Sequence, residues 1–573
     1  MCRVLALGFR HPAAAAVRLV LLAALLGGGT SAQPVPVGAR PNVVLLVADD
    51  LGYGDLGAYG SPDARTPHLD ALAAEGLRFT DFYAGGPVCT PSRYALLTGL
   101  HTFRAGDDHL LEPLYVGTGN RSGLSDEVVT LAEALKGEGY ETALIGKWHL
   151  GHGNMPEGGA PDTRFHPLYH GFDTFFGSIR GGIDYNTHWH QDDFLDWWEG
   201  RRLVPEDSLL YATHVFGDRA VDFLDAHAGA GTTEPPFFLY LPVTAPHYGN
   251  TANTGARARM QLPVGEEQER EYLSRFDDLY PDDDHIRKRF LAMTAVLDDE
   301  VGRIVEALER NGLRENTLVW VLSDNGAALR LGGSNGALRG QKKEPYEGGI
   351  RVPSFVVWPD RIAPGATAQL GSHTDVFPTV VALAGGALTH GVDGLDLSTY
   401  LLGGSPVARG VAVPNTHYGD AYRLRDWKYV RHYGPGARTA LYDLAANPAE
   451  ATDLSAVYPD TLALLEALMP YGSPPPPTGE EPPPNPLLTA TLRVVPNPAP
   501  GDAAAHLELI APVAGAVRVE VFDALGRRLA LLYDGPLNAG TNTLALPTRR
   551  PPLVVVRATG PFGTLTARAI RVR

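Results

Sequence analysis

Four apolar runs constrain the fold of this chain more than any other feature of its sequence. They span residues 42–48, 141–146, 237–243 and 317–322. Continuous apolar stretches of this length, rich in β-branched residues, are typical of strands buried on both faces of a parallel sheet. Helical patterns separate the runs, as at residues 290–308, where apolar side chains recur every three or four positions. The alternation predicts an α/β fold with a large mixed, mostly parallel sheet flanked by helices.

Each apolar run ends in polar residues. Ligands of such sheets bind beyond the carboxyl ends of the strands, so we expect these four ends to converge in space. The polar residues are Asp49 and Asp50 after the first run, Lys147 and His149 after the second, His247 after the third, and Asp324 and Asn325 after the fourth.

Two of the strand ends carry oxygen side chains only. The pairs Asp49-Asp50 and Asp324-Asn325 suit Ca²⁺ or Mg²⁺ and do not suit zinc. One acidic pair at a strand end is usually turn chemistry, but two such pairs after buried strands favour a metal site. Two other acidic runs lack that setting. We predict residues 298–299 as the solvated face of a helix and residues 282–284 as a surface loop.

One of the two cysteines, Cys89, stands at a predicted helix start, and it is the only one expected in the mature protein. Thr90 is expected to cap the helix and Pro91 to take its first position. The helix dipole then favours an anion or a reactive group at Cys89, although a buried structural cysteine is the alternative. Five basic side chains can form a cationic ring for a tetrahedral oxyanion around this turn. They are Arg93, Lys147, His149, His247 and Lys342, each of which is by itself more often structural.

These motifs resemble those of the sulfatase family over about residues 40–470. Residues 89–93, Cys-Thr-Pro-Ser-Arg, are similar to the Cys-x-Pro-Ser-Arg signature of that family. The other similar stretches follow in family order, at residues 41–59, 146–151, 323–326, 338–353 and 441–444. The resemblance implies a sulfuric ester hydrolase of the arylsulfatase type.

The resemblance also implies the chemistry of the site. A formylglycine-generating enzyme converts Cys89 to formylglycine, whose hydrate attacks sulfur with one hydroxyl and releases sulfate through the other. Ca²⁺, or Mg²⁺, is held by Asp49, Asp50, Asp324 and Asn325 together with residue 89. The implied roles of the basic residues are oxyanion stabilisation by Arg93 and Lys147, proton removal by His149, protonation of the leaving oxygen by His247, and sulfate binding by Lys342.

The domain organisation follows from changes in composition along the chain. Residues 1–32 resemble a signal peptide, with Arg3, Arg10 and Arg18 around a short apolar core. Removing that segment takes away Cys2, so no internal disulfide forms in the mature chain. We expect a catalytic α/β domain at residues 40–416, a small antiparallel-sheet lobe at 417–470, a proline-rich linker at 471–486 and an all-β sandwich at 487–573.

The charge of the last module is opposite to that of the rest. From residue 485 onward the chain has ten Arg against five acidic residues, whereas the formal net charge of the whole chain is −17. Motifs at residues 495–498, 521–528, 538–541 and 568–573 resemble a type IX secretion sorting domain. This resemblance implies secretion machinery as a partner and a secreted or outer-membrane location, with the periplasm as the alternative. An Ig-like accessory domain is the other interpretation.

Three functions remain open at this point. The first is hydrolysis of an aryl or carbohydrate sulfate ester, the second is hydrolysis of a phosphonate or phosphate diester, and the third is non-catalytic binding of sulfated glycans at a cell surface. Nucleic acid is not expected as a partner because the chain is strongly acidic. Residues 177–190 and 265–284 are expected either to shape the substrate cleft or to be surface loops.

Overall fold

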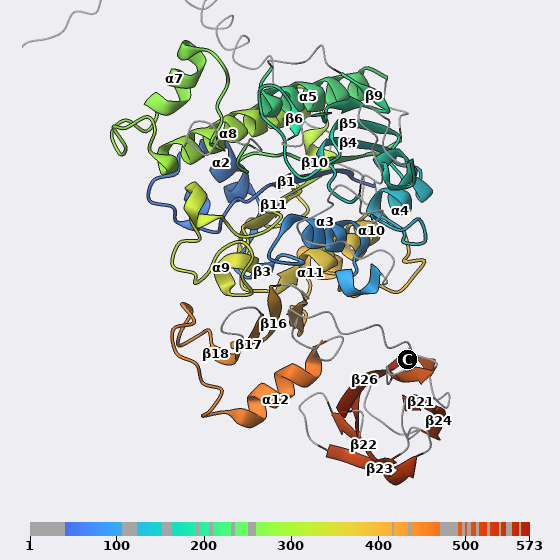
Figure 1. Ribbon diagram of the computed structural model, residues 1–573. Helices are drawn as coiled ribbons and strands as arrows, with labels where there is room; N and C mark the ends of the chain where they lie inside the picture. The colour runs from blue at the N-terminus through green and yellow to red at the C-terminus, as the bar shows by residue number, and fades with distance from the viewer. Residues whose placement is uncertain are drawn as a thin grey trace, which may run out of the picture. The chain divides into compact units, whose positions relative to one another are not determined.

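The computed structural model describes the chain from residue 40 onward, with gaps (Figure 1). The described residues are 40–105, 123–151, 163–190, 194–204, 210–230, 235–249, 259–414, 418–433, 438–469, 491–495, 499–500, 506–511, 515–523, 528–537, 540–545, 553–560 and 563–572. The predicted signal peptide and proline-rich linker lie outside them.

A ten-stranded mixed sheet forms the centre of the catalytic domain, as predicted. Strand β1 (Asn42–Ala48) pairs in parallel with both β10 (Phe237–Pro242) and β11 (Thr317–Ser323). The remaining strands are β4 (Glu141–Lys147), β5 (Thr174–Ser178), β8 (Trp198–Glu199) and β9 (Arg202–Leu203) beyond β10, and β12 (Ser354–Val357), β2 (Leu77–Phe79) and β13 (Gly365–Thr367) beyond β11. The pairs β11–β12, β12–β2, β5–β8 and β8–β9 are antiparallel.

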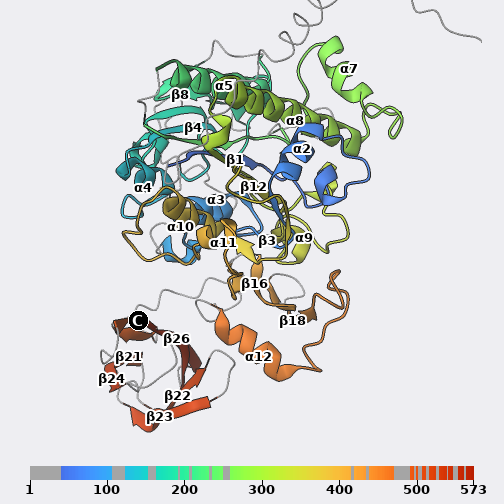
Figure 2. The ribbon, with the colours of Figure 1, turned by 180° about the vertical axis from the view of Figure 1, so that it is seen from behind.

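Helices cover both faces of this sheet, so β1 is buried on both faces. Val44 and Leu46 belong to the core shared with α2 (Pro67–Glu75), α5 (Ala212–Ala230) and α8 (Ile286–Arg310). Val43 and Leu45 belong to the opposite core, which contains α3 (Cys89–Thr98), α4 (Leu131–Gly137) and α10 (His373–Leu383). Figure 2 shows α5 and α8 on one side of the sheet and α3 and α10 on the other. The uninterrupted apolar run of β1 is the sequence signature of this two-sided burial.

The structure corrects one prediction about α8. Asp298 was expected on the solvated face of that helix, but its side chain is buried. Its carboxylate accepts the backbone N–H groups of His68 (3.1 Å) and Leu69 (2.7 Å). These amides are at the start of α2, where they have no partner inside their own helix. Asp298 therefore caps α2 from another helix, while the neighbouring Asp299 is partly exposed and pairs with Arg275 at 2.8 Å.

A small four-stranded sheet follows the catalytic domain. It consists of β15 (Gly410–Val413), β16 (Gly419–Leu424), β17 (Trp427–His432) and β18 (Arg438–Asp443), all antiparallel. A turn at Arg425, with φ of 56°, divides residues 423–430 between β16 and β17. Helix α12 (Pro459–Leu468) packs on this sheet through an apolar cluster with Tyr422, Tyr429 and Leu441.

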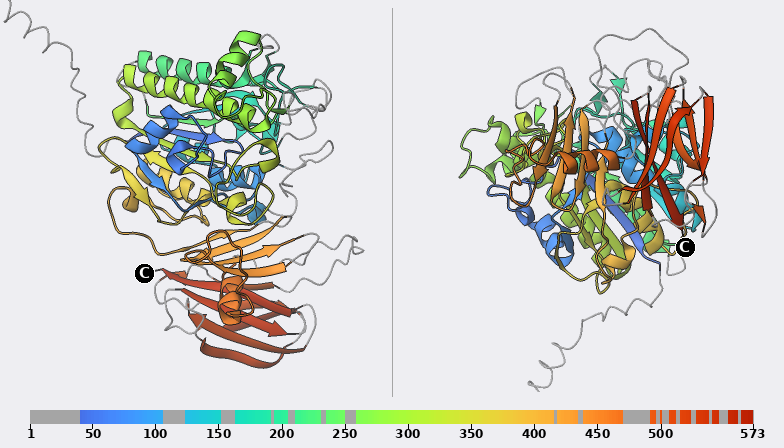
Figure 3. Two further views of the ribbon diagram at one scale, coloured as in Figure 1. Left: turned by 90° about the vertical axis from the view of Figure 1, so that its left-hand side faces the viewer. Right: turned by 90° about the horizontal axis from the view of Figure 1, so that it is seen from below.

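The described strands at the end of the chain form two further sheets, drawn in red in Figure 3. One contains β19 (Thr491–Val495), β21 (His506–Ala511) and β24 (Gly540–Ala545), and the other contains β20 (Ala499–Pro500), β26 (Gly563–Val572), β25 (Leu553–Gly560), β22 (Gly515–Asp523) and β23 (Arg528–Leu537). In β22, Val517, Val519 and Val521 are buried in alternation with Arg518 and Glu520. Parts of the predicted sorting motifs, at residues 496–498, 524–527 and 538–539, lie outside the described residues.

The remaining helices and strands of the catalytic domain are short. They are β3 (Phe82–Tyr83) with β14 (Gly371–Ser372), β6 (Trp189–His190) with β7 (Phe194–Leu195), and the helices α7 (Glu266–Ser274), α9 (Glu347–Ile350) and α11 (Ser398–Leu401). Of the helices formed by described residues, none has the length and apolar character to cross a membrane.

Candidate active site

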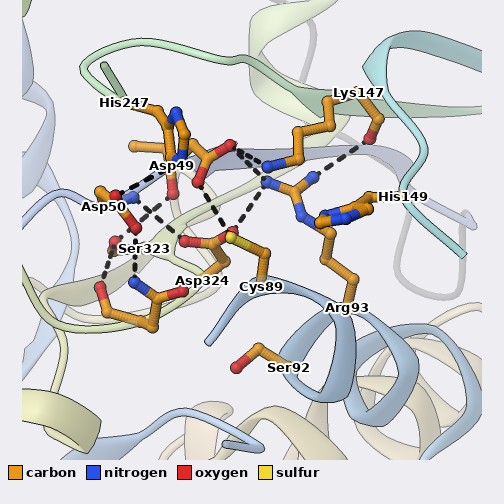
Figure 4. A network of polar contacts seen from close by, with 12 residues as sticks. Asp49, Asp50, Cys89, Ser92, Arg93, Lys147, His149, His247, Ser323 and Asp324 are labelled. Carbon is orange, nitrogen blue, oxygen red and sulfur yellow. Dashed lines mark hydrogen bonds and ion pairs between the residues drawn. The ribbon is translucent and has the colours of Figure 1, made fainter. Parts of the chain in front are cut away.

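The carboxyl ends of β1, β4, β10 and β11 bring the predicted polar residues together (Figure 4). The backbone itself ties these ends to one another. Asp49 donates its N–H to the carbonyl of Ala245 (3.2 Å) after β10, and Asp324 donates its N–H to the carbonyl of Ala48 (3.0 Å). Asp50 has a φ of 64°, a left-handed conformation that a non-glycine residue adopts at a cost. Its N–H binds Oδ1 of Asp324 at 3.1 Å, which holds that conformation.

Cys89 is the first residue of α3, so it lies at the helix N-terminus as expected. The capping residue differs from the prediction. Val88 occupies the cap position without a side-chain hydrogen bond, and Thr90 lies inside the helix. The hydroxyl of Ser92, inside the helix, donates to the carbonyl of Gly86 (2.8 Å) and accepts the N–H of Gly86 (3.2 Å). This pair of bonds folds the loop before Cys89 back onto the helix.

The Cys89 thiol is buried among charged groups. Its Sγ is 3.4 Å from Oδ1 of Asp49 and 3.5 Å from Nζ of Lys342, and the residue is 4% exposed. Burial, and next the charge of Asp49, raise the pKa of Cys89 to about 12, against the opposing effect of Lys147 and Lys342. The unmodified side chain is therefore a neutral thiol at pH 7 and is not activated as a thiolate nucleophile.

Three cations and three carboxylates pair around Cys89, and Figure 4 shows most of them. The pairs are Lys147–Asp49 (2.5 Å), Arg93–Asp324 (2.8 Å) and Lys342–Asp50 (2.6 Å). Arg93 also donates to the carbonyl of Lys147 at 3.1 Å. Because the acids and bases are equal in number, a divalent cation added here gives the site a net positive charge, which suits an anionic substrate.

Protonation states follow from these pairs. Burial alone raises the pKa of Asp49, but Lys147, His247 and Arg93 hold it well below its usual range. Burial, with Asp49 beside it, raises the pKa of Asp324 to about 6, and Arg93 opposes that rise. Burial lowers the pKa of Lys342, but Asp50 and Cys89 outweigh it and hold that pKa well above the usual value. At pH 7 Asp49, Asp324 and Lys342 are therefore charged.

The donor set fits a hard divalent cation. Ligand atoms of Asp49, Asp50, Cys89 and His247 lie within 4.8 Å of one another. Asn325 donates from Nδ2 to Asp50 (2.7 Å), which orients the amide, and its buried Oδ1 has no hydrogen-bond partner among the described residues. A buried carbonyl oxygen without a partner is costly unless it binds a ligand. Carboxylate and amide oxygens are the ligands that Ca²⁺ and Mg²⁺ prefer, so the residues present fit such an ion.

His149 stands beside Arg93 in Figure 4. Its φ is 56°, and its Nδ1 is buried without a hydrogen-bond partner among the described residues. Burial, Lys147 and Arg93 lower the pKa of His149 well below its usual value. Gly181 packs against the imidazole, since a Cβ at that glycine would lie 2.4 Å from the ring. His149 is thus a neutral imidazole at pH 7 that is able to accept a proton.

His247 faces the carboxylates from the loop after β10. Its Nδ1 lies 2.8 Å from the carbonyl of Tyr248. Because a carbonyl only accepts, Nδ1 carries the proton and Nε2, 3.6 Å from Asp50 Oδ2, has the free lone pair. Burial lowers the pKa of His247 to about 4 against the effect of Asp49. The ring is therefore neutral in the free protein.

Two supporting residues were not singled out from the sequence. The Tyr185 hydroxyl lies 2.6 Å from the carbonyl of Thr244 and 2.7 Å from that of His247, and so holds the His247 loop. His373 accepts the N–H of Gly85 (3.2 Å) and donates to the carbonyl of Ser323 (3.1 Å), joining the Cys89 loop to the end of β11. Tyr185 lies in the segment 177–190 that was expected to shape the substrate cleft or to be a surface loop, whereas no sequence pattern marked His373.

Comparison with known proteins agrees with this geometry. The family model described as Sulfatase matches residues 41–387. N-acetylgalactosamine-6-sulfatase of Canis lupus familiaris is 36% identical over 421 residues, which cover 70% of this chain and 73% of that protein. Arylsulfatase A of Homo sapiens is 37% identical over 451 residues, covering 75% of this chain and 80% of that protein.

A solved structure has a similar fold over most of its length. Ps i-CgsB in complex with k-i-k-neocarrahexaose superposes with a TM-score of 0.63 and 28% sequence identity. The superposition covers 74% of this chain and 91% of that chain.

Proposed function

This chain belongs to the sulfatase family, and from that premise we propose that it removes sulfate from a carbohydrate or aryl ester by means of a formylglycine made from Cys89 and a bound Ca²⁺. As a sulfatase it is an enzyme that hydrolyses sulfate esters. The observation that supports the mechanism best is the convergence of one buried cysteine, three carboxylates and three cations at the ends of four strands.

The proposed modification gives residue 89 a reactivity that its thiol lacks. In the hydrated aldehyde, one hydroxyl attacks sulfur, and the other later loses its proton so that the aldehyde re-forms as sulfate leaves. A bound Ca²⁺ supplies Lewis-acid stabilisation of the negative charge on the nucleophile and the sulfate oxygens. Asp49, Asp50, Asp324 and Asn325 would hold that ion together with residue 89.

The chain's cations orient the anionic group and stabilise its charge. Nζ of Lys342 lies 3.5 Å from Cys89 Sγ, and we assign this lysine to a sulfate oxygen. Lys147 pairs with Asp49 and Arg93 pairs with Asp324. We assign both cations to stabilising an oxyanion at residue 89. Buried, fixed donors of this kind provide the largest single contribution to many hydrolytic rates.

The two histidines have separate proposed roles. His149 is neutral and accepts the proton of the second hydroxyl. His247 is also neutral in the free protein, because burial lowers its pKa to about 4. A sulfate ester bound beside it brings a negative charge, which raises the pKa of an adjacent imidazole. The substrate itself thereby allows His247 to carry the proton that the leaving oxygen takes.

The relatives support a sulfated carbohydrate as the substrate class. One of them is named N-acetylgalactosamine-6-sulfatase, and another, Ps i-CgsB, was solved in complex with k-i-k-neocarrahexaose. The loop of Tyr185 lies next to His247, which faces the proposed leaving group. We therefore place the sugar of the substrate against this loop.

Paired assays test the reaction. The mature protein is offered an aryl sulfate, an aryl phosphonate monoester and a set of sulfated saccharides, and the peptide containing Cys89 is examined by mass spectrometry. Formylglycine at residue 89 and a higher kcat/KM on the sulfate ester support the proposal. A higher kcat/KM on the phosphonate favours the alternative hydrolase, and binding of sulfated glycans without turnover favours the non-catalytic function.

We also propose that the chain is exported, on the strength of residues 1–32 and the motifs of the last module. Its partners are then a formylglycine-generating enzyme and the secretion machinery, and its location is the medium or the outer-membrane surface. Fractionation of the native host, with N-terminal sequencing of the recovered protein, tests this. Cleavage after Ala32 and recovery outside the cell are expected, whereas an intact N-terminus in the cytoplasm contradicts it.

A further inference from the structure

A network of charged side chains joins the four-stranded lobe to the catalytic domain. Lys428 of β17 lies 2.8 Å from Glu347 of α9 and 2.8 Å from Glu450, and all three side chains are fully buried. Glu450, with a φ of 50°, also accepts the backbone N–H of Glu347 at 2.7 Å. We call these three residues the charge clamp.

The clamp continues toward the start of β3. The Tyr83 hydroxyl donates to Glu347 Oε2 at 2.9 Å, and Arg351 contacts the same carboxylate at 3.2 Å. Arg423 of β16 reaches Tyr83 and Asp81, and Arg351 contacts Asp81 at 3.2 Å. The network contains three acids, Asp81, Glu347 and Glu450, and three bases, Arg351, Arg423 and Lys428, so its charge is balanced.

Stability alone does not account for burying these charges. Desolvating an ion pair costs about as much as the attraction returns, and apolar side chains of similar size often stabilise a protein more. The lobe already has an apolar core of its own, with Tyr429, Leu441 and Leu465. A second apolar cluster, which includes Tyr346 and Val430, fastens it to the catalytic domain. The apolar clusters already attach the lobe to the catalytic domain, and the ion pairs fix the position of the lobe relative to α9.

The residues next to the clamp are in direct contact with the active site. Gly349 of α9 accepts the N–H of Gly326 at 3.0 Å, directly after Asn325. The fit is tight, since a Cβ on Gly326 would lie 1.9 Å from the carbonyl oxygen of Gly348. The last residue of α9, Ile350, accepts the N–H of Ala84 at 2.7 Å, on the segment that leads to Cys89.

The segment that carries Lys342 is fixed by the same part of the fold. This segment leads into α9, which begins at Glu347. Lys342 donates its N–H to the carbonyl of Ala327 (3.0 Å). Its neighbour Lys343 donates its N–H to Pro87 (2.8 Å). Helix α9 is therefore the point where the Asp324-Asn325 turn, the Cys89 loop and the Lys342 segment meet.

We propose that Lys428 and Glu450 are positioning residues for the active site: by fixing Glu347 they set the place of α9, and through it the distance between the Asp324-Asn325 turn and the Cys89 loop. Neither residue touches the reacting atoms. The part of the proposal that concerns turnover rests on the proposed sulfatase mechanism, whereas the part that concerns the metal-binding turn does not.

The test compares full-length Lys428→Met and Glu450→Gln with Arg431→Gln. Arg431 lies on the same strand, pairs with Glu466 inside the lobe and has no ion pair with α9 among the described residues. Ca²⁺ affinity is measured by calorimetry on the metal-stripped proteins, and kcat and KM on an aryl sulfate. The two clamp variants are expected to bind Ca²⁺ about tenfold more weakly, the lower range for residues that orient metal ligands. Their kcat should fall by a similar factor with KM within about threefold.

Hydrogen exchange of the peptide containing Gly326 supplies a third measurement. Faster exchange at Gly326 in the clamp variants, and not in Arg431→Gln, supports the positioning role. Unchanged Ca²⁺ affinity, kcat and Gly326 exchange together with a lower Tm would overturn it, because the clamp would then only stabilise the fold. Equal losses in Arg431→Gln would overturn it as well.

Two further outcomes are separated by design. If the unaltered protein binds Ca²⁺ but hydrolyses no sulfate ester, the proposed function fails while the affinity and exchange measurements still decide the positioning role. Glu450→Gln keeps an acceptor for the Glu347 N–H and removes only one charge, so it decides the question if Lys428→Met does not fold.

Discussion

Nζ of Lys147 lies 2.5 Å from Oδ2 of Asp49, and neither side chain is exposed to solvent. The pair joins the end of β4 to the end of β1 across β10. Each charge is therefore the principal compensation of the other in an environment without water. Removing one partner leaves a buried charge, which costs far more than the net value of the pair.

Lys147→Met is expected to lower the free energy of unfolding by about 3–5 kcal/mol in the metal-free protein. The double variant Lys147→Met/Asp49→Asn should regain most of that loss, because no unpaired charge remains. Urea denaturation measures both. Lys136→Met is the control, since it breaks the exposed pair with Asp173 at 2.6 Å and should cost about 1 kcal/mol or less. Equal costs for the two lysines would contradict the prediction.

Cys89→Ala should reduce hydrolysis of an aryl sulfate by a factor on the order of 10³ or more, because the nucleophile is lost. Cys89→Ser should be similarly impaired if residue 89 acts as an aldehyde hydrate, since serine has no second hydroxyl. The Tm should change little, because Sγ makes only long contacts, at 3.4 and 3.5 Å. A Cys89→Ala protein that retains full turnover would exclude the mechanism.

Asn325→Ala is expected to weaken Ca²⁺ binding by about tenfold or more, because the unpartnered Oδ1 is removed and Asp50 loses its amide donor. Chelation should abolish turnover in the unaltered protein, and added Ca²⁺ should restore it. Asn316→Ala is a matched control at the opposite end of β11, where Oδ1 is also buried and has no hydrogen-bond partner in the described part of the chain. Its Ca²⁺ affinity, measured by calorimetry, should equal that of the unaltered protein.

Acid sensitivity should trace in part to His373. Burial lowers the pKa of His373 to about 4, below the value of about 6.5 for an unfolded chain. As the pH falls through 6.5, the unfolded chain binds the proton first, so the stabilisation present above pH 6.5 is lost toward pH 4. This group accounts for about 2 kcal/mol between pH 7 and pH 5. His373→Gln should show a shallower loss of unfolding free energy over that range, and an unchanged slope would refute the assignment.

Asp298→Ala should destabilise the protein by about 1–2 kcal/mol, the usual cost of losing a helix cap. Two amides of α2, those of His68 and Leu69, lose their acceptor. Asp299→Ala removes a partly exposed pair with Arg275 and should cost about 1 kcal/mol or less. Both variants should keep the kcat of the unaltered enzyme, because neither side chain contacts the active site. Thermal unfolding with parallel kinetics distinguishes them.

The parts of the fold that the sequence predicts best are those that repeat. The run of six apolar residues at 43–48 in β1 predicts two-sided burial, and each strand end then locates polar residues such as Asp49 and Asp324 at one edge. Periodicity also located α8, yet it misassigned Asp298. The periodicity of a helix describes the average position of its side chains. It does not show that one carboxylate accepts the free backbone N–H groups of another helix far away in the sequence.

The supporting residues were harder to predict for the same reason. Lys428 is one of six lysines in the chain, and its place on a short predicted strand does not distinguish it from a surface lysine. Only the folded chain shows both of its buried partners. His373 resembles any histidine near a helix start, although both of its ring nitrogens join separate segments of the site. Roles of this kind depend on tertiary neighbours, which a single sequence does not specify.

The position of β1 between β10 and β11 has a kinetic consequence. Asp49 and Asp50 reach their partners only after β1 has paired on both sides with strands that are distant in the sequence. Such non-local, parallel pairing is slow to form, because the chain loses conformational entropy on closing long loops before the new contacts compensate for that cost. Recovery of turnover during refolding should therefore lag behind the circular dichroism signal of the helices. Enzymatic activity then reports when the last long-range strand pairing forms.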